Sequence, residues 1–365
     1  MGVQPESTPS TATYTSTIYQ WETNDPVLGG SGGIANNPIL GLCNRTQWLF
    51  NKVSSLVIGT DVQAYDADLA AIAALTGTGL LRRTGTNTWA LVSPFSDNSI
   101  AQGRLTLSSG TAVTTTDQVG QTTLYYTPYG GNGISLWNGS EWVFYTFQER
   151  TLSLAGLAAN TNHDIFVWDS GGGNLSLQAI AWTNGTTRAT ALSLRNGVWV
   201  KSGDDRRYLG TIRTTGSVGQ CEDSEAKRFV WNARNRVPRK LFGFDGAVNY
   251  TYSGTSFRAT NNNALCRIEI VVGLPGEEIL YVQGGNGHSS GDGLVSIGVN
   301  STTIASADLS GNSAQGNATN RNLTYFTHLY SPPSLGYSYY QLLEASETGA
   351  VTEFVTPRIA GAWRA

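Results

Sequence analysis

The stretch ALCRIEIVVGL (residues 264–274) is typical of a β-strand, because β-branched side chains favour extended backbone. Polar loops rich in Gly and Asn, such as GGNGHSSGDG (284–293) and SGNSAQGNATNRN (310–322), interrupt the strands that follow. These further strands are EEILYVQG, LVSIGVNSTTIAS, YFTHLYS, YSYYQLLEAS, VTEFVTP and IAGAW. Evenly spaced strands with long polar loops predict a sandwich or jelly roll in the last part of the chain.

The same β pattern extends toward the N-terminus. Residues 77–92 predict a hairpin in which Trp89 and Leu91 return against Leu80 and Leu81. Strand follows strand over 101–212, where the Asn-Gly pairs at 138–139, 184–185 and 196–197 predict type I′ turns. The hairpins SLWNGSEWV (135–143) and SLRNGVWV (193–200) echo each other, and we interpret this as a common hairpin solution rather than a duplicated domain.

One short stretch, DVQAYDADLAAIAAL (61–75), predicts a helix instead. Thr60 and Gln63 have the spacing of a capping box. An apolar stripe runs along one face, with Ala on its flanks, and it consists of Val62, Tyr65, Leu69 and Ile72. So narrow a stripe cannot be buried by one helix, so the helix either packs on its own domain or forms a seam with copies of itself. Just upstream, Leu49, Val53 and Leu56 also have the spacing of a coiled-coil seam.

The composition limits the classes of partner. Only 13% of the 365 residues are charged, and the net charge of −3 provides no basic field for nucleic acid. The most charged segment, 204–242, interleaves acids with its Arg and Lys, so we interpret it as a linker strand with salt bridges between subunits. Cys43, Cys221 and Cys266 are too scattered for a disulfide framework and predict reduced thiols. We expect neither a signal peptide nor membrane insertion.

Motifs of catalysis are missing from the sequence. His163, His288 and His328 are isolated, and no nucleophile elbow, zinc-protease or phosphate-loop motif occurs. We interpret HSSGDG (288–293) as a surface loop, and Glu277–Glu278 and the pair Glu344 and Glu347 as solvated carboxylates. We therefore expect no enzyme activity, no catalytic residue, no metal site and no cofactor.

Aromatic and amide side chains are the remaining functional signal. Trp beside Asn, Ser and Asp is suited to carbohydrate binding, because the indole ring stacks on a sugar while the polar side chains bind the hydroxyls of that sugar. Core packing nevertheless remains the preferred interpretation for each tryptophan of the middle region: Trp137, Trp142, Trp168, Trp182 and Trp199.

Four segments resemble bacteriophage tail fibres and receptor-binding fibre proteins. DPVLGGSGGIANNPILGLCNRTQWLF (25–50) resembles their N-terminal segment, and residues 61–92 resemble a recurring segment of fibre and virion proteins. YLGTIRTTGSVGQCEDSEAKRFVWNARNRVPRKL (208–241) is similar to a connector in receptor-binding proteins. GYSYYQLLEA (336–345) with IAGAW (359–363) resembles the closing strands of jelly-roll tips.

The resemblance implies a mostly β homotrimeric fibre made in the host bacterial cytoplasm and located in the virion. The expected parts are a virion-attachment segment (1–60), a helical neck with a hairpin (61–100), a β-rich middle domain (101–213), a connector (214–244) and a receptor-binding domain (245–365). The resemblance implies that virion tail or baseplate proteins bind the N-terminal segment. It also implies that the distal β domains bind a glycan of the host surface, which we expect to be lipopolysaccharide.

The site predictions follow from these parts. The trimer interface is expected at Val62, Tyr65, Leu69 and Ile72, and receptor binding at His288, Asp292, Tyr337 and Tyr339. Three alternatives stay open: a capsid or baseplate fibre with mainly an assembly role, a polysaccharide depolymerase, and a bacterial adhesin. Depolymerase spikes carry a repetitive β-helix, and no such period is visible here. A metal ion on the trimer axis also stays an open question.

Overall fold

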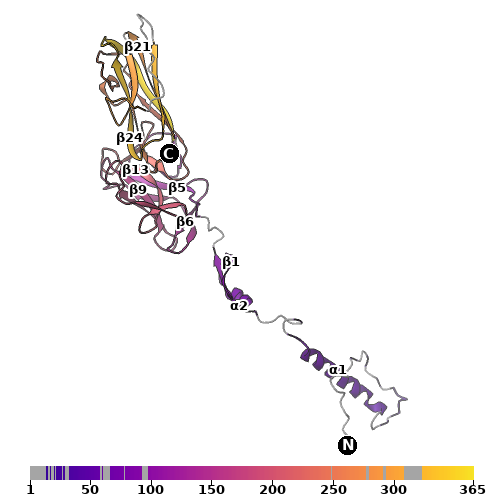
Figure 1. Cartoon of the computed structure of the whole chain (residues 1–365). Helices are drawn as coiled ribbons and strands as arrows, with labels where there is room; N and C mark the ends of the chain where they lie inside the picture. Colours follow the sequence, from indigo (N-terminus) through magenta and orange to yellow (C-terminus); the bar gives the residue numbers. More distant parts are fainter. Residues whose placement is uncertain are drawn as a thin grey trace. The chain divides into compact units, whose positions relative to one another are not determined.

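The protein is mostly β, as predicted, and it divides into an N-terminal unit, Met1–Val92, and a C-terminal unit, Ser93–Ala365. The structure, a computed structural model, describes residues 14, 17, 20, 22–26, 28, 33–57, 60, 66–77, 79–92, 98–247, 249–276, 279–290, 293–307 and 323–365, without the side chains of 287–290 and 323–326 (Figure 1). The predicted middle domain, connector and C-terminal domain all lie within the second unit.

A long helix opens the described part of the N-terminal unit. It follows the short 3-10 turn η1, Ile34–Asn36, and α1 spans Asn37–Ser54 with Pro38 in its first turn, where proline suits a helix. The stretch Asn36-Asn37-Pro38 therefore starts a helix. None of the side chains of α1 is buried within this chain.

The predicted helix over 61–75 is shorter than expected. Helix α2 spans Ala67–Ala73, and Asp66 caps it by accepting a hydrogen bond from the Asp68 amide at 2.8 Å. The prediction of one continuous helix from the Thr60 capping box is therefore wrong, because Asp66 has an extended backbone, and residues 61–65 lie outside the described residues. Val62 and Tyr65 lie outside the described residues, Leu69 is half exposed and Ile72 is partly buried.

Helix α2 is tied to a hairpin. Strands β1, Leu80–Gly85, and β2, Thr88–Val92, pair as the sequence predicts, with Leu81 opposite Leu91. Asp68 of α2 accepts from the indole N–H of Trp89 at 3.0 Å and forms a 3.1 Å ion pair with Arg83. The helix therefore has polar anchors within its own unit.

The first half of the C-terminal unit is built on a six-stranded sheet in the order β10-β9-β13-β12-β11, with β16 beside β13. Its strands are β9 Asn162–Asp169, β10 Leu175–Ala181, β11 Leu192–Arg195, β12 Val198–Lys201, β13 Arg207–Arg213 and β16 Val230–Asn232. Two smaller sheets accompany it, formed by β3 Gly103–Thr106, β5 Thr123–Pro128 and β8 Arg150–Ser153, and by β6 Gly133–Trp137 and β7 Trp142–Thr146.

The second half contains two larger sheets. The seven-stranded sheet has the order β19-β24-β20-β15-β14-β4 with β22 beside β24, and the five-stranded sheet has the order β17-β25-β21-β23 with β18 beside β25. The strands of the former are β4 Gln118–Gln121, β14 Cys221–Asp223, β15 Lys227–Arg228, β19 Arg258–Ala259, β20 Arg267–Val272, β22 Gly293–Val299 and β24 Gly336–Ser346. Those of the latter are β17 Pro238–Phe244, β18 Tyr250–Tyr252, β21 Leu280–Ser290, β23 Leu323–Ser331 and β25 Thr352–Arg364, and the 3-10 turn η2 spans Thr260–Asn262.

One buried cluster connects these sheets. Ile268 and Ile270 of β20 are fully buried with Val282 of β21 and Ile359 of β25, so both large sheets contribute to the same core. The cluster continues into the first half through Tyr208 and Trp231, whose rings stack 6.4 Å apart. A side chain at Gly273 would collide with both rings, which explains the glycine there.

Only one Asn-Gly pair forms the predicted two-residue turn. At 196–197, between β11 and β12, both residues have positive φ, 50° and 81°. At 138–139 only Gly139 does, and Asn138 instead accepts hydrogen bonds from the amides of Ser140 and Glu141. At 184–185 neither residue has positive φ, so the type I′ prediction is wrong for these two pairs.

The charged segment also differs from its prediction. It supplies strands to three sheets, and its acids pair within one chain: Glu222 with Lys227 at 3.1 Å, and Asp223 with Arg228 at 3.1 Å and Arg239 at 2.9 Å. The prediction that this segment forms salt bridges between subunits is therefore wrong for Glu222 and Asp223, which pair within the chain.

Glu344, expected at the surface, is fully buried. The phenol of Tyr250 donates to it at 2.6 Å, Arg258 pairs with it at 2.9 Å, and the Asn261 amide donates at 3.1 Å. Its partner in the predicted pair, Glu347, is exposed, and Glu277 and Glu278 lie outside the described residues.

The buried carboxylate of Asp245 provides a pH-dependent prediction. It accepts hydrogen bonds from the side chains of Asn263 at 2.7 Å and Asn261 at 2.8 Å, and from the Ala247 amide at 3.0 Å. Burial alone would raise its pKa, but these donors outweigh burial and hold the pKa below its usual range. Because the folded-state pKa is lower than the unfolded one, this stabilisation is present above the unfolded pKa and is lost as pH falls through the folded pKa.

Asp245→Asn should therefore lower the free energy of unfolding by about 1–3 kcal/mol at neutral pH, as expected for hydrogen bonds to a charged group. The difference from wild type should shrink as the pH falls, which denaturant titrations at several pH values would measure. The exposed Glu141→Gln serves as the matched control. A difference for Asp245→Asn that does not vary with pH would contradict this explanation.

Candidate functional site

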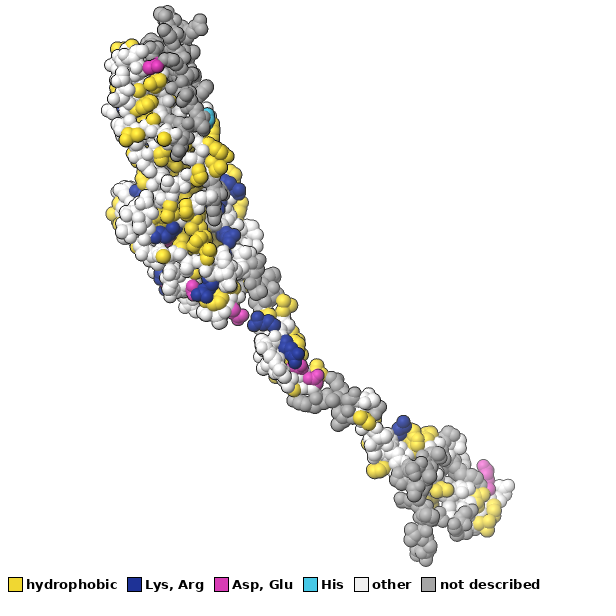
Figure 2. Space-filling view, in the orientation of Figure 1, with side chains coloured by type: hydrophobic (Ala, Val, Ile, Leu, Met, Phe, Trp, Pro, Cys, Tyr) yellow, Lys and Arg dark blue, Asp and Glu magenta, His cyan; other side chains and the backbone are white. Residues whose placement is uncertain are grey.

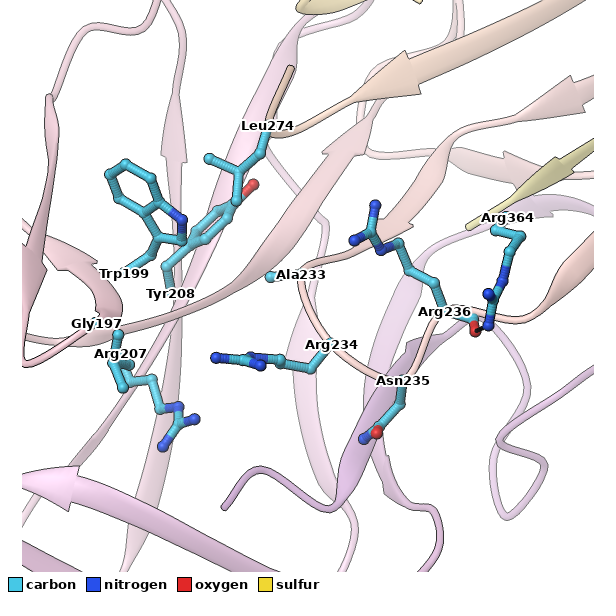
Figure 3. A pocket seen from close by; sticks show the side chains of 11 residues that line it. Gly197, Trp199, Arg207, Tyr208, Ala233, Arg234, Asn235, Arg236, Leu274 and Arg364 are labelled. Carbon is cyan, nitrogen blue, oxygen red and sulfur yellow. Dashed lines mark hydrogen bonds between the residues drawn. The ribbon is translucent and has the colours of Figure 1, made fainter. Parts of the chain in front are cut away.

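Two hollows of the C-terminal unit share Arg207 as a lining residue. The first, which we name the tryptophan hollow, has a volume of about 500 Å³. The second, the arginine hollow, has a volume of about 450 Å³ and is drawn in Figure 3. Both hollows are lined mainly by residues at strand ends and turns, where side chains can vary without disturbing a sheet.

The tryptophan hollow takes its rings from strand ends. Successive side chains of a strand point to opposite faces, so the buried Leu136 and Val167 direct the neighbouring Trp137 and Trp168 away from the core. Both tryptophans are half-buried and lie at or next to the last residue of β6 and β9. The hollow is completed by Asn138, Gly139, Tyr145, Asp169, Asp204, Asp205, Arg206 and Arg207.

Arginine side chains hold both indole rings in place. The guanidinium carbon of Arg195 lies 4.5 Å from the Trp137 ring centre, and that of Arg206 lies 4.1 Å from the Trp168 ring centre. Arg195 pairs with Asp205 at 2.6 Å, and Arg206 approaches Asp204 at 3.3 Å. Each guanidinium covers one face of its ring, so the rings and carboxylates are positioned before any ligand arrives.

Asp169 and Tyr145 add a polar pair to the hollow. The Asp169 carboxylate accepts from the amides of Gly171 at 2.9 Å and Gly173 at 3.0 Å. Burial, the charge of Asp169 and the hydrogen bond to it all raise the pKa of Tyr145. The phenol therefore stays protonated at neutral pH. Together these groups accept and donate hydrogen bonds beside two aromatic rings.

The arginine hollow is shaped by the loop between β16 and β17. Asn235 has a positive φ of 56°, and its side-chain amide donates to the carbonyls of Ala101 at 2.7 Å and Gly103 at 3.1 Å. Arg234 and Arg236 flank this anchor. Arg364 of β25 donates to the Arg236 carbonyl at 3.0 Å, so residues from two distant segments meet here. Figure 3 shows Arg234 extending toward the side where Arg207 lies, with Arg236 and Arg364 beside each other opposite.

Of the predicted receptor-binding residues, Tyr337 and Tyr339 line neither hollow. Tyr337 of β24 donates to Glu269 at 2.6 Å, and the Arg213 guanidinium lies 3.8 Å from its ring centre. Tyr339 has Arg267 at 4.3 Å. His288 lies on β21, a strand of the other large sheet, and its side chain, like Asp292, is outside the described part. The contacts of Tyr337 within the chain account for its position, and the receptor role of these four residues stays a prediction.

Sequence reasoning missed the acids and the arginine hollow. Trp137 and Trp168 were visible as aromatic strand residues, but nothing local to them points to Asp169, Asp204 or Asp205. For the arginine hollow a signal existed, because residues 226–240 contain six basic residues and no acid. This basic run is hard to recognise in the sequence, because acidic residues precede it and make the whole charged segment look mixed.

Two further findings on the described ranges concern metal ions and membranes. Within them, no three His, Cys, Asp or Glu side chains gather in a way that could hold a metal ion. None of their helices combines the length and hydrophobicity needed to cross a membrane.

The chain was compared with known proteins. No family model matches it, and no curated protein matches it. Among solved structures, the insecticidal delta-endotoxin Cry8Ea1 from Bacillus thuringiensis matches with 8% identity and a TM-score of 0.22, over 72% of this chain and 52% of the toxin. The β-porphyranase BpGH86A of glycoside hydrolase family 86, from the human gut bacterium Bacteroides plebeius, matches with 11% identity and a TM-score of 0.20, over 69% of this chain and 38% of the enzyme. The structure of infectious bursal disease virus, Gx strain, matches with 11% identity and a TM-score of 0.17, over 74% of this chain and 81% of the viral chain.

These similarities are weak. The chain spans about half the length of the toxin and less of the enzyme. At such identities and TM-scores, none of the neighbours bears on function.

Proposed function

We propose that this protein is a homotrimeric phage tail fibre that is attached to the virion by its N-terminal segment and binds a glycan of the host surface through its C-terminal unit. The observation that carries the proposal is the tryptophan hollow. Two half-buried indole rings there stand beside carboxylates, an amide and a phenol at strand ends.

This combination suits a sugar. The apolar face of a pyranose stacks on the indole face opposite the arginine, and the neighbouring oxygen and nitrogen atoms bind its hydroxyls. Asp204 and Asp205 are already paired with basic residues, which holds their oxygens at fixed positions. Backbone and side chains that are neither hydrophobic nor charged also cover much of the visible face of the C-terminal unit (Figure 2), as suits reversible contact with a polar glycan.

The N-terminal unit supports the trimer. On α1, Ile39, Leu42, Leu49 and Val53 are all exposed, with Thr46 completing a stripe of alternating three- and four-residue spacing. That spacing is the a/d pattern of a left-handed coiled coil, and an exposed stripe of this kind needs partner helices. Three copies of a shallow sugar site per fibre would raise the effective affinity without new contacts.

Trp168→Ala tests the sugar site. It should weaken binding of the full chain to its polysaccharide about tenfold, the order of effect that aromatic stacking contributes. An array of purified bacterial lipopolysaccharides and capsular polysaccharides would measure this. The matched control is Tyr330→Ala, which removes an exposed aromatic ring from β23 of the same unit.

Three outcomes would count against the proposal. An equal loss with Tyr330→Ala would show that the hollow is not the site. No binding to any polysaccharide on the array would favour an assembly role on the capsid or baseplate. Release of reducing ends from a bound polysaccharide would instead favour a depolymerase.

A further inference from the structure

Among the residues that the structure describes, the arginine hollow is lined by four arginines and by no aspartate or glutamate. These arginines are Arg207, Arg234, Arg236 and Arg364. The chain as a whole is slightly acidic, with a net charge of −3, so the gathering of four arginines around one hollow is not a consequence of composition. Gathered like charges raise the electrostatic potential inside a hollow and attract anions.

The acids of the surrounding charged segment are engaged by other cations. Asp204 pairs with Lys201 and Asp205 with Arg195. Glu225 pairs with Lys240 at 2.8 Å. Glu222 and Asp223 are taken by Lys227, Arg228 and Arg239, as described above. Each acid of the segment therefore has a basic partner outside the arginine hollow.

Arg234 makes no hydrogen bond or ion pair with any residue that the structure describes, and it is exposed at the mouth of the hollow. Arg207, by contrast, is almost fully buried and donates to the carbonyls of Ser135 at 2.6 Å and Asn98 at 3.0 Å. The hollow thus combines a buried guanidinium that is held by hydrogen bonds with an exposed guanidinium that can turn toward a ligand.

The loop that carries Arg234 and Arg236 is held at both ends. Asn232 is buried and accepts from the Leu105 amide at 2.7 Å while donating to the Leu105 carbonyl at 3.3 Å. Asn235 is anchored to Ala101 and Gly103, and Arg236 lies 5.3 Å from the ring centre of Trp231. Because the backbone of this loop is already fixed, the loop loses little conformational entropy when a ligand binds.

We propose that the arginine hollow binds an anionic substituent of the surface glycan, either the phosphate of a sugar phosphate or the carboxylate of an acidic sugar. Guanidinium groups match the planar spacing of such oxygens and can bind them with paired hydrogen bonds. Arg207 lines both hollows, so the two candidate sites share one residue of β13. This inference rests on the proposed glycan binding and narrows it to acidic glycans.

The test uses the full-length protein and three probes: glucose 6-phosphate, glucuronic acid and glucose. Ligand-observed NMR titrations at low and high sodium chloride would give their affinities. At least one acidic probe should bind more tightly than glucose, and added salt should weaken that binding, because ions screen exposed charges. The acidic probe that binds better identifies the substituent as phosphate or carboxylate.

The double variant Arg234→Gln and Arg236→Gln should lower the affinity for the acidic probe about tenfold, as expected for loss of charge-assisted hydrogen bonds. The control, Arg358→Gln, removes an exposed arginine of β25 outside both hollows and should change nothing. Thermal unfolding of both variants would show that the fold is kept.

Three results would overturn the inference: acidic probes that bind no better than glucose, binding that the double variant leaves intact, or an equal loss in Arg358→Gln. Failure of the glycan proposal itself is distinguishable. If the polysaccharide array still detects Trp168-dependent binding while the acidic preference is absent, only the arginine hollow has been misassigned.

Discussion

Replacing Leu49 and Val53 with aspartate should convert the protein from trimers into monomers while the C-terminal unit stays folded. Both side chains are more than half exposed on α1, at 54% and 65%, and they occupy the stripe that we assign to the coiled-coil seam. Carboxylates at these positions would face one another around the trimer axis, where like charges repel and lose hydration. Sedimentation should change from about three times 39.0 kDa to a single chain mass.

Two further variants make this test specific. Leu40→Asp adds the same charge to the same helix outside the stripe and should leave the trimer intact. Leu69→Asp tests the interface predicted on α2, where Leu69 is also exposed. If Leu69→Asp dissociates the trimer and the α1 double variant does not, the seam lies on α2. A wild-type protein that sediments as a monomer would contradict the fibre proposal.

Asp164→Ala should lower the free energy of unfolding by about 3–5 kcal/mol, the cost of breaking a buried ion pair. Asp164 is almost fully buried and pairs with Arg188 at 2.7 Å. Thr211 also donates to it at 2.7 Å. Without the carboxylate, the guanidinium of Arg188 would remain largely buried with its charge unbalanced. Chemical denaturation with a single fitted transition would measure the loss.

The control for this variant is an exposed ion pair of the same half. Asp204→Ala removes a carboxylate that pairs with Lys201 and Arg206 near the surface, so its cost should stay below about 1 kcal/mol. Arg188 also donates to the carbonyl of Gly273, which follows β20 in the second half. Equal costs for the two variants would show that burial adds nothing to the contribution of the pair between Asp164 and Arg188.

Much of the fold could be predicted from local sequence. The hairpin of β1 and β2 was predictable because Thr86 and Asn87 form a turn between alternating strands. The Asn-Gly pair at 196–197 was predictable for the same reason. At Asn138 the prediction failed because the side chain itself accepts two backbone amides and so closes a longer loop.

The ends of helices were harder to predict. For α2, Thr60 and Gln63 have the right spacing for a cap, but the described helix is capped by Asp66, six residues closer to the hairpin. For α1, the sequence pattern at Leu49 and Val53 was recognised, yet its extension back to Ile39 became visible only once Pro38 was seen to start a helix. Capping depends on which of several candidate residues the tertiary contacts favour.

By itself, the sequence determined that this protein is mostly β, with strands, turns and one apolar helix stripe, because these features depend on residues that are neighbours in the chain. Only the tertiary structure decided which side chains meet. Trp137, Trp168 and Asp204 form one hollow, and Arg234 and Arg364 line another, across separations in sequence that no local pattern records. Strand order brings them together, and strand order depends on how the whole chain buries its apolar side chains.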